Sequence, residues 1–221
     1  MKTPDIKQIF IGLALLLPIL TLLFYTIRGM DNGDGNRSPR NYARLKLVTP
    51  TDTADELSRI IAQDDFETAV IKINEELKDP NVPDAAGIPL LVLAAQKNNA
   101  ELVSLLLERG ASPNFGEVGS GETALMKAAR HGNVEIINML LFANADLNAV
   151  SKRGVTPLTS AVANGSQALV DFLLTRGARA GASEANLFNY AFAKNFIGVN
   201  AMLRNGVSPN ITDAGGNTPL I

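Results

Sequence analysis

Residues 154–181 read GVTPLTSAVANGSQALVDFLLTRGARAG, and this stretch decides the fold. Thr156 can cap a first helical turn, Pro157 suits the first position of that helix, and Gly165 suits its end. Apolar residues then recur at the spacing of one buried helix face: Leu169, Val170, Phe172 and Leu173. The stretch therefore predicts a helix, a tight turn and a second helix.

The same unit recurs along the chain. Its last five residues, GARAG at 177–181, have counterparts in GASPN at 110–114, NADLN at 144–148 and GVSPN at 206–210. The first two steps are about 33 residues long and the third is shorter, a period typical of repeat proteins. Residues 121–133, GETALMKAARHGN, repeat the helix start at Thr123 and the helix end at Gly132.

These motifs resemble the ankyrin repeat family, whose units of about 33 residues pair a T-P-L-H-x-A helix start with a G-A-D-x-N ending. Thr156, Pro157 and Leu158 match the start letter for letter. The resemblance implies an all-α ankyrin solenoid of helix–turn–helix units joined by hairpin loops. We expect a single transmembrane helix to precede it.

The repeats and the sequence ahead of them predict the domain organisation. The expected segments are a tail at 1–8, a transmembrane signal-anchor helix at 9–28, a flexible linker at 29–52, and ankyrin repeats at 53–221. Within the last segment we expect a cap at 53–83, repeats at 84–115, 116–149 and 150–181, a divergent repeat at 182–211 and the start of a further repeat at 212–221. Because one repeat cannot bury its face alone, we expect the chain to be truncated after Ile221.

The fourth repeat departs most from the pattern. Asn186, Leu187 and Phe188 replace the Thr-Pro-Leu start, and we expect Tyr190 and Phe192 to bring aromatic bulk into the inner helix. Its hairpin is also short. The stack should therefore bend there, or pack this helix differently.

A membrane anchor is predicted from Ile9 to Ile27, where IFIGLALLLPILTLLFYTI carries no charge. At about 1.5 Å per residue this run spans most of a roughly 30 Å hydrocarbon layer. A cleaved signal peptide is the alternative, because Lys2 and Lys7 precede the run, but no small-residue cleavage site follows it. We expect a single-pass protein of a bacterial inner membrane.

The side of the membrane stays open at this point. The basic residues that follow the run favour a cytoplasmic C-terminal domain. A short tail ahead of an apolar run is instead typical of a bacterial signal anchor whose following domain is exported. We expect the repeats on the periplasmic side.

Composition excludes several function classes. A net charge of -2, from 20 basic and 22 acidic residues, lacks the excess of cations that binding nucleic acid requires, so we expect no nucleic-acid partner. The chain has no cysteine and one histidine, His131, which removes thiolate sites and any mechanism with two imidazoles. We expect no enzyme activity, no cofactor and no metal site.

One glycine-rich segment resembles a phosphate-binding loop only superficially. Residues 116–123, GEVGSGET, carry Glu122 where a P-loop needs its lysine, and a carboxylate there would repel phosphate. No buried strand precedes Gly116, as that motif also requires. The segment is predicted to be a hairpin between repeats.

The resemblance implies a binding surface, because ankyrin stacks grip folded proteins on a concave face of hairpin tips and inner helices. Mapped onto this sequence, the positions that face it are Gln96, Lys97, Glu122, Lys127, Arg130, His131, Lys152, Arg153, Val155 and Asn164. The set is more basic than acidic. We therefore expect a partner protein with an acidic patch, bound mainly near the second and third repeats.

The predicted function is that of a membrane-tethered module that captures a partner protein. Such a module could act as an inhibitor or immunity-type protein against an exported enzyme. The alternative is a structural or scaffolding subunit of a membrane assembly, in which Gly12 and Ala14 give the transmembrane helix a small-residue face.

Overall fold

A computed structural model describes residues 49–180, 184–212 and 215–219, without the side chains of 184–186. The predicted tail, the anchor and nearly all of the linker lie outside these residues. Within the described ranges, no helix has the length and apolar character needed to cross a bilayer. The described chain contains helices and loops and no strand, which confirms the all-α prediction for this part.

The helices come in consecutive pairs, as the repeats predict. Their bounds are α2 Pro50–Ala62, α3 Phe66–Glu75, α4 Leu90–Gln96, α5 Ala100–Glu108, α6 Ala124–His131, α7 Val134–Phe142, α8 Pro157–Asn164, α9 Gln167–Thr175, α10 Glu184–Phe192 and α11 Phe196–Arg204. Helix α2 begins three residues before the expected boundary at 53. Thr49 causes this, because its side chain accepts a hydrogen bond from the amide of Asp52, whose carboxylate caps Thr49 in return.

The predicted helix ends are largely observed. The hydroxyl of Thr156 accepts a hydrogen bond from the amide of Thr159, and Pro157 opens α8. Gly132 and Gly165 end α6 and α8 at φ of 77° and 85°, a conformation that costs little only in glycine. Thr123 differs from the expectation, since its hydroxyl is buried and makes no capping hydrogen bond.

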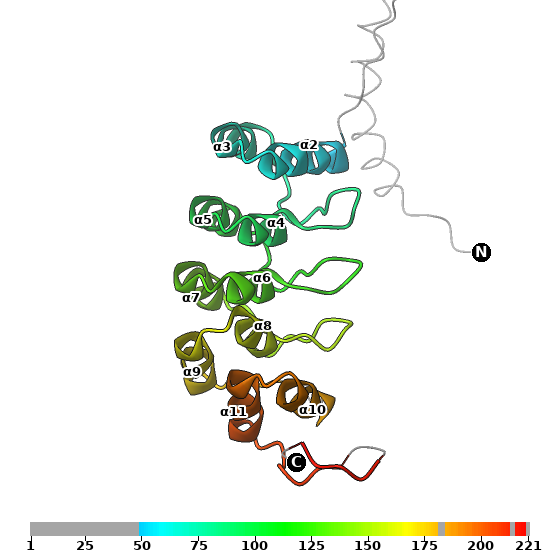
Figure 1. The fold of residues 1–221 in the computed structure, drawn as a ribbon. Coiled ribbons are helices and arrows are strands. Elements are labelled where there is room, and N and C mark those ends of the chain that lie inside the picture. The colour runs from blue at the N-terminus through cyan, green and yellow to red at the C-terminus, as the bar shows by residue number, and fades with distance from the viewer. Residues whose placement is uncertain (1–48, 181–183, 213–214, 220–221) are drawn as a thin grey trace, which may run out of the picture. The chain divides into compact units, whose positions relative to one another are not determined.

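From α2 to α8 each inner helix contacts the next inner helix, and the outer helices α3, α5 and α7 contact one another in the same order. Helix α6 lies between α4 and α8, and α5 packs against α7 (Figure 1). Leu91, Leu125 and Leu158 occupy equivalent positions of the three inner helices and are buried. Small residues at Ala94 and Ala128 allow the helix backbones to approach closely, so one continuous core runs through the stack.

A ladder of asparagine side chains joins each repeat to the next. The side-chain Nδ2 of Asn114 donates to the carbonyl oxygen of Asn144 at 3.1 Å, and its Oδ1 accepts from the backbone N–H of Asp146 at 2.6 Å. Asn81 and Asn148 make the equivalent pair of bonds into their following repeats. These bonds satisfy backbone groups at each junction and fix the spacing of the repeats.

The ladder changes direction at the fourth repeat. The sequence has Gly181 where an asparagine would continue the series. Asn205, at the end of α11, reaches back instead, and its Oδ1 accepts from the backbone N–H of Ala180 at 3.1 Å. The junction is therefore held from the opposite side.

Packing also changes at the fourth repeat, as predicted. Here α11 contacts both α8 and α9 and packs tightly on α10 (Figure 1). Gly198 makes this possible, because a Cβ at that position would lie 2.4 Å from Cγ of the Tyr190 ring. The expectation for Phe192 is wrong, since 95% of its surface is exposed. Of the two aromatic residues predicted to fill this helix, Tyr190 packs against the core and Phe192 does not.

Candidate protein-binding surface

The loops that precede α4, α6 and α8 project from the same side of the stack (Figure 1). Adjacent loops are joined by backbone hydrogen bonds, from Val118 N to the oxygen of Gly87 at 2.8 Å and from Lys152 N to the oxygen of Ser120 at 2.9 Å. We call these loops, with the solvent-facing side chains of α4, α6 and α8, the hairpin face. The bonds between loops make it a pre-formed surface.

The segment that resembles a phosphate-binding loop is a hairpin, as predicted. The amide of Glu117 donates to the oxygen of Glu122 at 2.9 Å, and that of Gly121 donates to the oxygen of Glu117 at 2.7 Å. Gly116 is required for close approach, since a Cβ there would lie 2.8 Å from the Gly121 oxygen. The amides of Glu117 and Gly121 thus bond within the loop, and that of Val118 bonds to the neighbouring loop.

The structure places the predicted site residues on the hairpin face with unequal access to solvent. Gln96, Arg130, His131 and Asn164 lie at the ends of the inner helices and are exposed. Lys152 and Arg153 are exposed on the third loop, whereas Lys97, Glu122 and Val155 are partly buried. Lys127 is buried, with 9% of its surface exposed. A partner could therefore reach most of the predicted set but not the Lys127 ammonium.

Lys127 lies at the centre of a charged cluster. Its Nζ is 2.6 Å from Oε2 of Glu122 and 2.8 Å from Oε1 of Glu117. A guanidinium nitrogen of Arg130 lies 3.1 Å from the other oxygen of Glu122. The cluster contains two carboxylates and two cations, so it adds no net charge to the hairpin face.

The cluster fixes the charge of its members. Burial disfavours the ionised form of Glu122, but hydrogen bonds from Lys127 and Arg130 outweigh this effect and lower its pKa. Burial likewise disfavours the ammonium of Lys127, and the bonds to Glu117 and Glu122 outweigh it and raise its pKa. Both groups are therefore charged near neutral pH.

Other predicted residues are also engaged within the stack. Lys97 Nζ lies 2.8 Å from both the Ala62 oxygen and Oδ1 of Asp64, and Lys152 Nζ donates to the Val118 oxygen at 2.7 Å. The amide of Asn164 donates to the carbonyl oxygen of Arg130 at 3.1 Å. The exposed cations of the second and third repeats are thus fewer than the sequence indicates.

Glu117 is the site residue that sequence reasoning missed. A signal was present, because Lys127 occupies the position of Leu93 and Ser160 in the neighbouring inner helices. Both of those residues are at least nine-tenths buried. A lysine at such a position requires nearby carboxylates.

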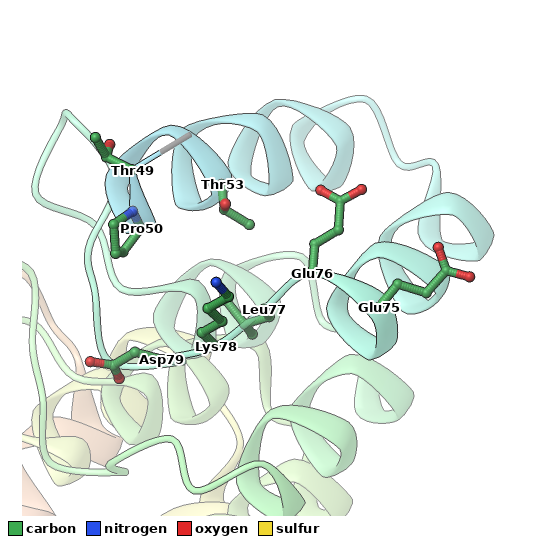
Figure 2. Close-up of a pocket in the computed structure, with 8 residues that line it drawn as sticks. All are labelled: Thr49, Pro50, Thr53, Glu75, Glu76, Leu77, Lys78 and Asp79. Carbon is green, nitrogen blue, oxygen red and sulfur yellow. The ribbon is translucent and has the colours of Figure 1, made fainter. Parts of the chain in front are cut away.

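The cap carries a pocket of about 380 Å³ between the start of α2 and the end of α3. Figure 2 shows the carboxylates of Glu75 and Asp79 on opposite sides of it. They do not converge as an acid–base pair would. Among the described residues there is also no group of three or more His, Cys, Asp or Glu side chains that could hold a metal ion.

Comparison with known proteins agrees with this geometry. The family described as Ankyrin repeats (3 copies) matches residues 59–151 and 91–184, together more than half of the chain. The E3 ubiquitin-protein ligase KEG of Arabidopsis thaliana is 33% identical over 160 residues, which cover 67% of this chain and 9% of that protein. A putative ankyrin repeat-containing protein of Treponema pallidum is 36% identical over 95 residues, covering 43% of this chain and 32% of the relative.

The match to another relative, the B-cell lymphoma 3 protein homolog of Mus musculus, is 33% identical over 103 residues and covers 23% of that protein. The chain thus spans between about a tenth and a third of the length of these relatives. The similarity concerns the repeats.

Proposed function

Because this chain belongs to the ankyrin repeat family, whose repeats mediate interactions between proteins, we propose that it captures a partner protein on the hairpin face and is tethered to a membrane by residues 9–27. The observation that supports the capture most directly is the row of exposed side chains at the ends of successive inner helices. Gln96, Arg130 and Asn164 belong to this row.

The hairpin face is pre-organised for binding. Hydrogen bonds join its loops, and Lys152 and Asn164 each bond to a backbone oxygen of the preceding repeat. Ordering loops and long side chains on binding costs about 0.5–1.5 kcal/mol for each immobilised side chain. Much of that cost is already met in the free protein.

The partner we propose presents an acidic patch to the second and third repeats. The Lys127 cluster, which includes Arg130, is neutral in sum, so the attraction rests mainly on Lys152 and Arg153, beside the exposed part of the Arg130 guanidinium. Arg130 forms an ion pair with Glu122 through one guanidinium nitrogen, and the rest of its side chain is exposed. Arg153 is exposed and has no ion pair within the described part of the chain.

Site-specific photo-crosslinking tests the capture. A photoreactive amino acid at position 153 should crosslink a discrete protein in the native host, whereas one at Glu101, on an outer helix, should not give that product. Arg153→Glu combined with Arg130→Glu should weaken binding of the identified protein at least about tenfold. Lys78→Glu, a single charge reversal on the cap, should leave it unchanged. A product that forms equally from both positions contradicts the proposal.

The tether is supported by the uncharged run from Ile9 to Ile27. We propose a bacterial inner membrane with exported repeats, which suits an inhibitor of an exported enzyme. Fusion of reporters after Ile221, one active only outside the cytoplasm and one only inside it, tests this topology. Activity of the cytoplasmic reporter alone would contradict export and direct the search to a scaffold for cytosolic proteins.

A further inference from the structure

Outer helix α7 ends in an aromatic side chain that is almost fully exposed. Phe142, the last residue of α7, has 92% of its surface exposed. The equivalent positions at the ends of α5, α9 and α11 are Glu108, Thr175 and Arg204, all polar. A phenylalanine in a position that is otherwise polar contributes nothing to the stack itself, so an exposed aromatic there points to a contact outside the fold.

Phe142 borders a groove between α5 and α7. The groove encloses about 400 Å³ and is lined by Ser104, Leu107, Glu108, Met139, Phe142 and Ala143. A second groove of about 480 Å³ shares Ser104, Glu108 and Met139 with it and extends to Val70 and Leu105. The two form one trough with an apolar floor across the outer helices, which lie on the side of the stack away from the loops (Figure 1).

The charges along this trough have one sign. Glu101, Glu108 and Glu135 line it, and no lysine or arginine is among the described residues that do so. Ser104 Oγ donates to Oε1 of Glu108 at 3.0 Å, which holds that carboxylate at the wall. An apolar floor with acidic walls is complementary to an amphipathic helix that carries lysine or arginine beside its apolar stripe.

We propose that this trough is a second docking site, which binds a basic amphipathic helix of a partner protein, with an apolar side chain of that helix packed on Phe142, Leu107 and Met139. The acidic walls disfavour the two other occupants. An anionic membrane surface would be repelled, and a second copy of the chain docked trough to trough would bring like charges together. The site is separate from the hairpin face, so the stack can hold two partners at once.

A designed peptide tests the site. The probe is a fluorescein-labelled synthetic helix of 18 residues with a leucine and phenylalanine stripe flanked by lysines, and its scrambled sequence is the first control. Fluorescence anisotropy measures binding to the full chain in detergent. Phe142→Ser and Glu108→Lys should each weaken binding at least about tenfold, since one removes the apolar contact and the other reverses a wall charge.

Matched variants make the outcome decisive. Phe192→Ser removes an equally exposed phenylalanine elsewhere, and Glu75→Lys makes the same charge change at the cap pocket. Both should bind the probe as the wild type does, and circular dichroism should show that all four variants are folded. Equal binding by the scrambled peptide, or unchanged binding by Phe142→Ser and Glu108→Lys, overturns the proposal. Arg130→Glu should not affect this peptide, which separates the result from that for the hairpin face.

Discussion

Replacing Lys127 by leucine tests whether the charged cluster of the second repeat stabilises the fold. Leucine fits the position, because Leu93 occupies it in the first repeat and is 8% exposed. The substitution removes the ammonium that contacts Glu117 and Glu122, whose side chains are only 17% and 13% exposed. Two poorly solvated carboxylates would then lose their principal cation.

The expected cost follows from the burial of the cluster. Removing one partner of a fully buried ion pair costs about 3–5 kcal/mol. The cost should be smaller here, because Arg130 stays on Glu122 and both carboxylates keep some contact with solvent. We therefore expect Lys127→Leu to lower the free energy of unfolding by about 1–3 kcal/mol near neutral pH.

The pH dependence has a defined sign. The pKa of Glu122 is lowered in the folded state, so its contribution to stability is present above its ordinary value of 4.5 and is lost as the pH falls through the lowered one. The pKa of Lys127 is raised, so its contribution is present below 10.5 and is lost as the pH rises through the raised value. The difference between wild type and Lys127→Leu should thus shrink at acid pH.

Urea unfolding of the full chain, followed by circular dichroism, measures the effect. The control is Lys127→Leu combined with Glu117→Gln and Glu122→Gln, which removes the buried charges together and should recover most of the loss. If Lys127→Leu alone is as stable as the wild type near neutral pH, the cluster does not stabilise the hairpin and the reasoning fails.

Three further changes follow from the packing of single residues. Gly198→Ala should destabilise the fourth repeat by about 1–3 kcal/mol through its clash with the Tyr190 ring, and Tyr190→Leu in the same chain should relieve part of the loss in urea unfolding. Asn114→Ala should lower the free energy of unfolding by about 1–2 kcal/mol and speed hydrogen exchange at the Asp146 backbone amide. Unchanged exchange at that amide would show that the ladder is dispensable. Lys194→Gly should raise the melting temperature, because Lys194 has φ of 55°, a conformation that costs non-glycine residues about 1–2 kcal/mol.

The start and end of most helices could be predicted because local chemistry determines them. Thr156, Pro157 and Gly165 each act within one helical turn, and all three behave as expected. Thr123 does not, although the sequence around it is similar. Its hydroxyl is buried at the base of a loop whose conformation depends on Glu117 and Glu122, and the helix pattern contains no information on that loop.

The charge of the binding surface was harder to predict than the helix ends, because it also depends on contacts between separate loops and repeats. Lys127 counts as a basic residue in the sequence, but the hairpin places Glu117 and Glu122 against it from the preceding loop. Likewise, Asp64 comes from the cap to pair with Lys97. Ion pairs between repeats depend on how neighbouring units stack, which sequence position alone does not give.

The small net charge of the chain conceals a separation of charge between its faces. Arg130, Lys152 and Arg153 are exposed on the hairpin face, while Glu101, Glu108 and Glu135 line the trough of the outer helices. At physiological salt the field of an exposed charge is screened over about 8 Å, so a partner senses the face it approaches rather than the sum over the chain. Net charge therefore gives no guide to the charge of a protein partner, because an acidic patch and a basic helix can each find a complementary face on one stack.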